Sequence, residues 1–288
     1  MPYRSIFRPG LLAGQLIVIT GGGSGIGRCV AHEASSLGAR VVLVGRKRER
    51  LVTVADEIGA DGGAAEIAPC DVRDEAAVST LVADLCARHG VIHGLVNNAG
   101  GQFQAPLDSL TQSGFETVLR TNLVGGFLMA REIFVRSMRK HGGAIVNMAA
   151  DVSRGTPSVA HSGAARAAMI HLTQTAAVEW APHGVRVNAV APGFIATQAL
   201  ARYGAQAIEA ILAPLVPLGR LGTEAEVSSA ICFLLSEGAA YISGATLCID
   251  GAAPAAHPLF PPSAHDKSPA FDGFHRSARH QRGDGTPD

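Results

Sequence analysis

The chain has 288 residues, of which 47% are hydrophobic. That content is sufficient for a substantial buried core, in one large α/β domain or two small ones. Lysine plus arginine and aspartate plus glutamate both number 24, so no charge excess exists to bind a phosphate backbone or anionic lipid over a broad surface. The composition therefore disfavours nucleic acid and membrane partners.

The spacing of the cysteines and the N-terminal sequence indicate the cellular compartment. The five cysteines are far apart and lack the C-x-x-C spacing of a zinc site or redox pair, which fits a reducing compartment and predicts no metal site. Arg4 and Arg8 are not followed by an apolar stretch with a cleavage site, and no segment reaches about 18 uninterrupted apolar residues. We expect a soluble, cytoplasmic protein.

Apolar, β-branched runs alternate with segments of helical period. The clearest runs are residues 16–19, 41–44, 92–96, 144–146 and 185–187. Continuous apolarity is typical of strands that are covered on both faces. Between the first two runs an apolar stripe recurs at spacings of three and four, which predicts a helix packed on a sheet. The sequence thus predicts an α/β fold, a Rossmann-like doubly wound parallel sheet with helices on both faces.

The C-terminal part has a different composition. After Asp250-Gly251 the chain is rich in Ala, Pro, His and Gly, and no second core follows. We therefore expect one domain over residues 1–253, and a tail over residues 254–288 that is extended or disordered.

A glycine-rich turn follows the first predicted strand and leads directly into the first predicted helix. Glycines let the backbone approach a pyrophosphate closely, and the free N–H groups at a helix start stabilise the anion. The spacing is G-x-x-x-G-x-G, and an ordinary strand-to-helix turn is the alternative interpretation. The residues expected to bind a dinucleotide here are Gly21, Gly23, Ser24, Gly25, Ile26 and Gly27.

The end of the second predicted strand bears on the choice of coenzyme. Gly45 stands where an acidic residue would hold a ribose 2′-hydroxyl, and Arg46, Lys47 and Arg48 follow it. A carboxylate would repel a 2′-phosphate, whereas a guanidinium pairs with it. We expect NADP(H) as the cofactor, with Arg46 at the 2′-phosphate. The alternative is that these cations are the solvated start of a helix.

Further motifs resemble the short-chain dehydrogenase/reductase superfamily over about residues 12–253. They are residues 97–100 (NNAG), 121–123 (TNL), 192–193 (PG) and 250–251 (DG). Each alone could be a turn, a cap or a buried amide. The resemblance implies a homodimer or homotetramer formed through helices at about 114–139 and 162–179. It also implies coenzyme contacts at Asp71, Val72, Asn98, Ala99, Gly100, Arg166, Pro192, Gly193, Ile195 and Thr197.

The usual catalytic groups of that family are incomplete in this chain. They are a Ser, a Tyr-x-x-x-Lys pair and an Asn. Here Ser162 stands at the tyrosine position, Arg166 at the lysine position and alanine at the serine position, so only Asn122 is retained. A serine hydroxyl is a far weaker acid than a phenol. Arg166 can bind nicotinamide ribose or phosphate, but it cannot give up its proton.

Reductases of acyl-CoA double bonds form a branch of the family without that tyrosine. Residues 100–103 and 161–167 resemble segments of peroxisomal trans-2-enoyl-CoA reductases. The 2,4-dienoyl-CoA reductases are also similar, with a catalytic Asn at the position of Gln102. Their separate tyrosine after the fifth strand is missing, because residues 149–151 read Ala-Ala-Asp. That departure argues against dienoyl chemistry.

The sequence therefore predicts an NADP(H)-dependent reductase of the 2,3 double bond of trans-2-enoyl-CoA, a fatty acyl thioester. Gln102 and Ser162 can donate hydrogen bonds to an enolate oxygen, and the proton can come from Tyr203, His161 or water. The expected catalytic residues are Asn122, Ser162, Arg166, Gln102 and Tyr203.

Two other functions stay open. Residues 3–11 and the context of residues 161–167 resemble bacterial enzymes assigned to citronellol and citronellal oxidation. The third interpretation is a cofactor-binding protein that has lost catalysis.

Overall fold

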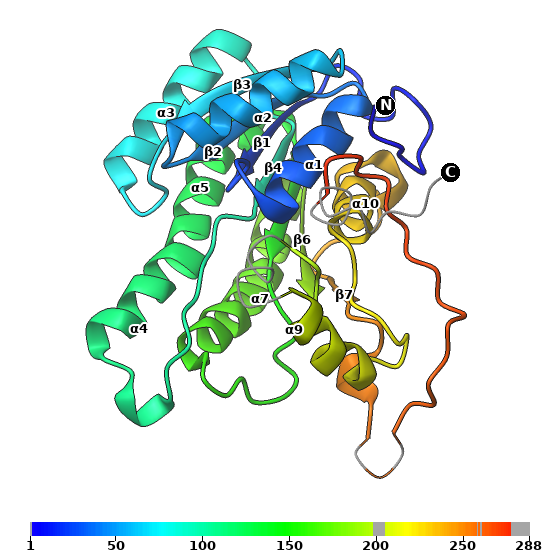
Figure 1. Cartoon of the computed structure of the whole chain (residues 1–288). Coiled ribbons are helices and arrows are strands. Elements are labelled where there is room, and N and C mark those ends of the chain that lie inside the picture. The colour runs from blue at the N-terminus through cyan, green and yellow to red at the C-terminus, as the bar shows by residue number, and fades with distance from the viewer. Residues whose placement is uncertain (1, 198–204, 258, 260, 278–288) are drawn as a thin grey trace.

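A single parallel sheet organises the chain (Figure 1). The computed structural model describes residues 2–197, 205–257, 259 and 261–277. Seven strands lie in the order β3-β2-β1-β4-β5-β6-β7, and every neighbouring pair is parallel. The strands are β1 (Leu16–Thr20), β2 (Arg40–Gly45), β3 (Ala64–Pro69), β4 (Gly94–Asn97), β5 (Gly143–Met148), β6 (Val185–Pro192) and β7 (Thr246–Ile249).

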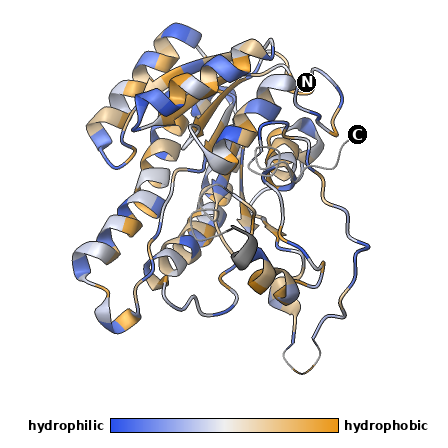
Figure 2. Cartoon of the chain, in the orientation of Figure 1, coloured by the Kyte–Doolittle hydropathy of each residue, from blue (hydrophilic) through white to orange (hydrophobic). Residues whose placement is uncertain are grey.

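Two layers of helices cover the sheet, as the sequence predicts. One hydrophobic core lies between the sheet and α1, α2 and α10, and a second lies between the sheet and α3, α5 and α7. Figure 2 shows hydrophobic strands between helices that carry hydrophilic residues. These helices are α1 (Gly25–Ser36), α2 (Arg48–Ala60), α3 (Glu75–His89), α5 (Gly125–Ile133), α7 (Ala160–Trp180) and α10 (Glu224–Leu235).

The strand order reverses at β1, which pairs with β2 on one side and with β4 on the other. Val18 of β1 lies opposite Val42 of β2 and Leu95 of β4, and all three are buried. In a parallel sheet of this kind the crevice at the reversal point, beyond the carboxyl ends of the strands, is where ligands bind. The loops after β1 and β4 therefore define the place to look for a site.

One long helical segment forms the side of that crevice. It comprises α4 (Gln112–Leu119), a π-helical turn (Arg120–Val124), α5, a second π-helical turn (Phe134–Met138) and α6 (Arg139–His141). Short π-helical turns within α-helices are frequent at functional sites. The first of them contains Asn122, which the sequence places in the catalytic set. Among the described helices, none is long and apolar enough to cross a membrane.

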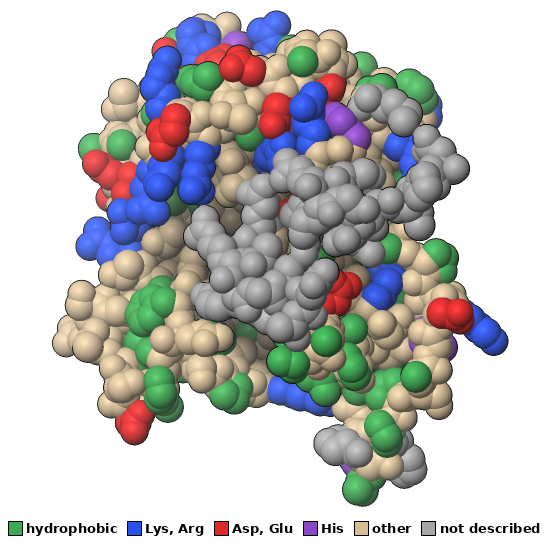
Figure 3. Space-filling view, viewed as in Figure 1, with side chains coloured by type: hydrophobic (Ala, Val, Ile, Leu, Met, Phe, Trp, Pro, Cys, Tyr) green, Lys and Arg blue, Asp and Glu red, His purple; other side chains and the backbone are tan. Residues whose placement is uncertain are grey.

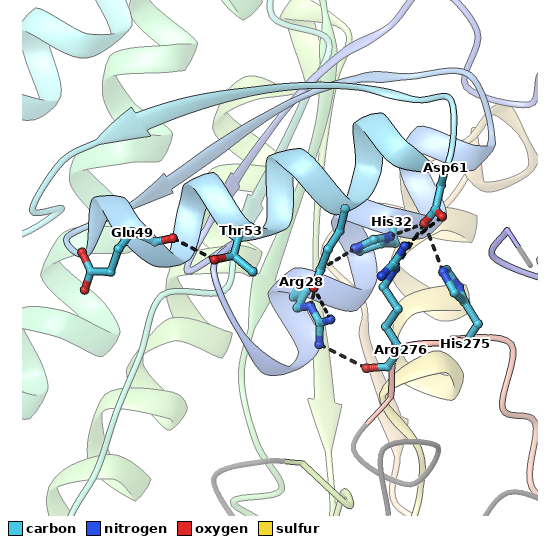
Figure 4. Close-up of polar contacts among 8 residues, drawn as sticks. Arg28, His32, Glu49, Thr53, Asp61, His275 and Arg276 are labelled. Atoms are coloured by element: carbon cyan, nitrogen blue, oxygen red, sulfur yellow. Dashed lines mark hydrogen bonds and ion pairs between the residues drawn. The ribbon is translucent and has the colours of Figure 1, made fainter.

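The C-terminal segment, which we define as residues 265–277, packs across α10 and α1. It has no helix or strand. Phe274 is nevertheless fully buried, in a small core with Tyr3, Cys29 and Ala225. Beside this core, α1, α2 and the C-terminal segment meet in a polar cluster (Figure 4). The segment is thus part of the folded domain.

Candidate active site

The glycine-rich turn between β1 and α1 leaves no room for a side chain at Gly21 or Gly27. Gly21 has a φ of +68°, and a Cβ built on it would lie 2.7 Å from Asn98 Nδ2. A Cβ on Gly27 would collide with the same amide and with the carbonyl oxygen of Gly21. Gly25 begins α1, whose first turn contains no acidic residue. Backbone N–H groups and the positive end of the helix dipole are therefore open to an anion.

Asn98 holds this turn in shape. Its Nδ2 donates to the carbonyl oxygen of Thr20 at 3.0 Å. The Thr20 hydroxyl oxygen accepts from the backbone N–H groups of Asn98, at 3.0 Å, and Ala99, at 2.9 Å. These bonds tie the end of β1 to the end of β4, so the structure brings together the two motifs that the sequence assigns to the coenzyme.

Arg46 lies at the rim of the same crevice, just before α2. Its side chain is exposed, and Figure 3 shows basic side chains gathered on the side of the molecule where α2 begins. Asp71, at the end of β3, forms a 2.6 Å ion pair with Arg73. Hydrogen bonding from Arg73 lowers the pKa of Asp71, and the charge of Arg46 lowers it further. Arg46 is therefore close enough to Asp71 to act on its charge. Val72, the next residue, is buried and packs against Gly125 of α5.

Asn122 holds the loop that follows β4. Its Oδ1 accepts from the N–H of Gly101 at 2.8 Å, and its Nδ2 donates to the carbonyl oxygen of Gly101 at 3.0 Å. A Cβ on Gly100 would lie 2.5 Å from Arg166 Nη2 and 3.1 Å from Asn122 Oδ1. Three of the residues predicted from the sequence, Gly100, Asn122 and Arg166, thus meet at one point. The buried amide fixes the backbone directly before Gln102.

Arg166 reaches from α7 across to the end of β5. Its Nη1 donates to the carbonyl oxygen of Met148. Desolvation lowers the pKa of the guanidinium to about 10, which leaves it a cation at neutral pH. Arg166 therefore supplies a fixed positive charge and N–H donors at the lysine position, and it does not supply a proton.

The start of α7 lies against the loop that carries Gln102. The ring of Phe103 meets the ring of His161 edge to face, with centroids 4.5 Å apart. His161 is buried, its Nδ1 accepts from the N–H of Ser162 at 2.8 Å, and its Nε2 has no hydrogen-bond partner among the described residues. A neutral His161 therefore carries its proton on Nε2. Ser162 is buried beside it, and Gln102 is exposed at the surface of the loop.

The segment after β6 lies on the other side of the crevice at the carboxyl ends of the strands. The N–H of Gly193 donates to the carbonyl oxygen of Ile249 at 3.0 Å, and a Cβ on Gly193 would lie 2.9 Å from the Cα of Asp250. A side chain there would push β6 and β7 apart, which explains the glycine after Pro192. Ile195 forms an isolated bridge with Gly222. Thr197 ends the described part of this segment, and Tyr203 lies outside the described residues.

A dinucleotide fits the residues that are present. A Cβ on Gly21 or Gly27 would collide with neighbouring atoms, Gly25 has a φ of +55°, and the first turn of α1 has no acidic side chain of its own. The residues that would hold the diphosphate are those of the turn, and Asn98, Ala99 and Gly100 would line its nicotinamide end.

Comparison with known proteins identifies the class. The family model described as Enoyl-(Acyl carrier protein) reductase matches residues 21–252. The chain belongs to this family of short-chain dehydrogenases/reductases and is an oxidoreductase of that type.

Individual relatives carry different names. The chain is 37% identical over 253 residues to peroxisomal 2,4-dienoyl-CoA reductase of Mus musculus, covering 86% of this chain and 87% of that protein. It is 37% identical over 242 residues to a 2,4-dienoyl-CoA reductase of Bacillus subtilis, covering 82% of this chain and 95% of that protein. A solved structure of a citronellol catabolism dehydrogenase from Pseudomonas aeruginosa PAO1 is 60% identical, with a TM-score of 0.80, covering 87% of this chain and 99% of that one.

A further structural neighbour contains a coenzyme. It is a structure from Beutenbergia cavernae with NADP bound at low occupancy, assigned as a NAD(P)-dependent gluconate 5-dehydrogenase. It is 35% identical, has a TM-score of 0.81, and covers 86% of this chain and 100% of that one.

Proposed function

We propose that the chain is an NADP(H)-dependent reductase of the 2,3 double bond of trans-2-enoyl-CoA thioesters. The observation that carries the proposal is the pair Ser162 and Arg166 on α7, where carbonyl-reducing members of the family have a phenol and an ammonium group. Reduction of a carbonyl requires a proton donor at the oxygen, whereas reduction of a conjugated double bond requires only stabilisation of negative charge there.

Each remaining group has a role in this reaction. When bound, NADPH supplies the hydride, which adds to the β-carbon of the substrate. Negative charge then develops on the thioester oxygen, and Gln102 Nε2 and Ser162 Oγ donate hydrogen bonds to it. Arg166 holds the nicotinamide ribose by its N–H donors. Asn122 is a positioning residue, because it reaches the substrate side only through its two hydrogen bonds to Gly101.

The proton that completes the reaction is delivered to the α-carbon. Of the described tyrosines, Tyr3 is buried and donates to Glu33 Oε2 at 3.0 Å, on the α1 side of the sheet, and Tyr241 is exposed. The candidates are therefore His161, Tyr203 and water.

NADP(H) is the proposed coenzyme because of Arg46. Its guanidinium lies at the end of β2, near Asp71, with no carboxylate at Gly45 to repel a 2′-phosphate. The neighbour from Beutenbergia cavernae with bound NADP supports the same choice.

A second candidate function is oxidation of a terpenoid alcohol. The 60% identity to a citronellol catabolism dehydrogenase favours it. Such a reaction requires an acid or base at the substrate oxygen, and His161 and Tyr203 are again the available groups.

We also propose that the chain forms a homodimer or homotetramer. Two helices of one sheet face carry apolar side chains that are exposed in the single chain. They are Val124 and Phe127 near the start of α5, Val135 in the following π-helical turn, and Val178 on α7. A self-complementary apolar surface is typical of symmetric association.

The experiment that tests the proposal follows coenzyme absorbance. Purified protein is mixed with NADPH and a panel of trans-2-enoyl-CoAs, 2,4-dienoyl-CoAs, enals and ketones, and separately with NADP+ and citronellol. Oxidation of NADPH by enoyl-CoA alone supports the proposal, and turnover of citronellol without enoyl-CoA turnover supports the second candidate. Tight NADPH binding with no turnover of any substrate would indicate a cofactor-binding protein without catalysis.

A further inference from the structure

A buried carboxyl group lies under the phosphate-binding turn. Glu224 is the first residue of α10 and is 3% exposed. Its Oε1 lies 3.9 Å from the Cβ position of Gly25, the first residue of α1. Among the described residues, this oxygen has no hydrogen-bond partner. A polar atom that is buried without a partner costs free energy, so its position at the turn calls for an explanation.

Among the described residues, the charged and titratable groups around Glu224 come from α1 and from the C-terminal segment. Arg28 and Cys29 belong to α1, and Asp272 belongs to the C-terminal segment. Burial raises the pKa of Glu224 to about 7, Arg28 opposes this rise, and the charge of Asp272 adds to it. The carboxyl group therefore changes its charge near neutral pH, while the neighbouring thiol of Cys29 stays protonated because burial raises its pKa.

We propose that Glu224 couples coenzyme binding to proton uptake. The inference rests on the proposed coenzyme site, because it requires a diphosphate at the start of α1. A diphosphate at Gly25 brings negative charge close to this carboxyl group, and like charges in a buried site favour the protonated form. Coenzyme binding therefore makes Glu224 take up a proton, and coenzyme affinity falls as pH rises and the free carboxyl ionises.

Calorimetry of NADPH binding measures this uptake directly. Titrations near pH 7.5 in several buffers of different ionisation enthalpy give the number of protons taken up per coenzyme bound. We expect the wild-type chain to take up about half a proton more than Glu224→Gln. The 2′-phosphate of the coenzyme also titrates, but its contribution is the same in both proteins and cancels in the difference.

The dissociation constant gives an independent readout. Between about pH 6 and about pH 9, the Kd for NADPH should rise about tenfold more in the wild-type chain than in Glu224→Gln. Asp272→Asn leaves Glu224 in place but removes a charge that raises its pKa, so it should move the midpoint of the pH dependence to lower pH. This second variant tests the inference even where the glutamine variant folds poorly.

The outcomes separate this inference from the proposed function. If neither NADPH nor NADH binds, both fail. If NADPH binds with equal proton uptake in the wild-type chain and Glu224→Gln, or if Asp272→Asn leaves the midpoint unchanged, only the role of Glu224 is wrong.

Discussion

At the scale of single residues, coenzyme choice rests on Arg46. Changing Arg46 to Asp replaces a donor to the 2′-phosphate by a repelling charge, and a charge-assisted hydrogen bond is worth about 2 kcal/mol. We expect the Kd for NADPH to rise at least about thirtyfold, with little change for NADH. Fluorescence titration with both coenzymes measures this. Lys140→Asp makes the same charge change at an exposed position at the end of α6 and should leave both constants unaltered. An unchanged NADPH preference in Arg46→Asp would refute the coenzyme assignment.

Single substitutions test whether Ser162 and Gln102 each donate a hydrogen bond to the thioester oxygen. Removing a single hydrogen-bond donor to a developing oxyanion typically lowers kcat about 100-fold. We expect that loss in Ser162→Ala and in Gln102→Ala, with NADPH binding unchanged, because neither side chain is needed to form the cradle of the coenzyme. Steady-state kinetics with enoyl-CoA and calorimetry with NADPH separate the two effects.

Tyr203→Phe is the matched test of the proton donor. If it keeps full kcat while Gln102→Ala loses most of its activity, the tyrosine has no catalytic role and the proton comes from His161 or water. The variant His161→Gln then distinguishes these two, because loss of activity in it assigns the proton to the histidine, whereas full activity leaves water as the donor.

At the scale of elements, the turn between β1 and α1 depends on the absence of side chains. Gly27→Ala places a methyl group against Asn98 Nδ2 and the carbonyl oxygen of Gly21. The backbone oxygen cannot move without opening the turn, so we expect loss of NADPH binding and a destabilisation of about 2 kcal/mol. Gly59→Ala is the control, since a Cβ at that helical position in α2 meets nothing within 4 Å. It should bind NADPH normally and be slightly stabilised. Normal NADPH binding by Gly27→Ala would count against the site.

The elements that the sequence predicts well are those whose burial is complete. The runs at 16–19 and 41–44 are confirmed as β1 and β2 because both faces of these strands are covered, which makes every position apolar. β3 is not visible as an apolar run because it is an edge strand, and only one of its six residues is fully buried. The run at 92–96 begins too early, since Ile92 is buried in the turn before β4.

The site residues that the sequence predicts are those with a local motif, and the contacts between distant segments are those it does not predict. The glycines of the turn and the NNAG motif were predicted because each residue has a local chemical reason to be there. Local patterns do not reveal contacts between segments that lie far apart in the chain. The hydrogen bond from Gly101 to Asn122 and the approach of Glu224 to Gly25 are contacts of this kind. A single buried oxygen leaves no periodic signal.

At the scale of the whole molecule, the C-terminal segment ties several parts of the chain together. The backbone oxygen of Phe271 accepts from the Thr223 hydroxyl at 2.6 Å at the start of α10. Arg28 of α1 donates to the carbonyl oxygen of Arg276 at 3.1 Å, and the Arg276 side chain pairs with Asp61 at 3.1 Å, just after α2 (Figure 4). The composition of the tail predicted no such role, because a few anchoring contacts suffice to order a short segment that has no helix or strand.

Phe274→Ala tests how much these contacts contribute. The ring is fully buried against Tyr3 and Cys29, and deletion of a buried phenylalanine ring typically costs about 3–5 kcal/mol. For a domain of this size we expect Tm to fall by about 10 °C. Leu259→Ala, at a side chain that is 78% exposed, should change Tm by about 1 °C or less. The segment also supplies Asp272, so loss of its packing exposes Glu224 to solvent. The Kd for NADPH should therefore depend less on pH in Phe274→Ala than in the wild-type chain. An unaltered Tm and an unaltered pH dependence would show that the segment contributes neither to the stability of the domain nor to the environment of Glu224.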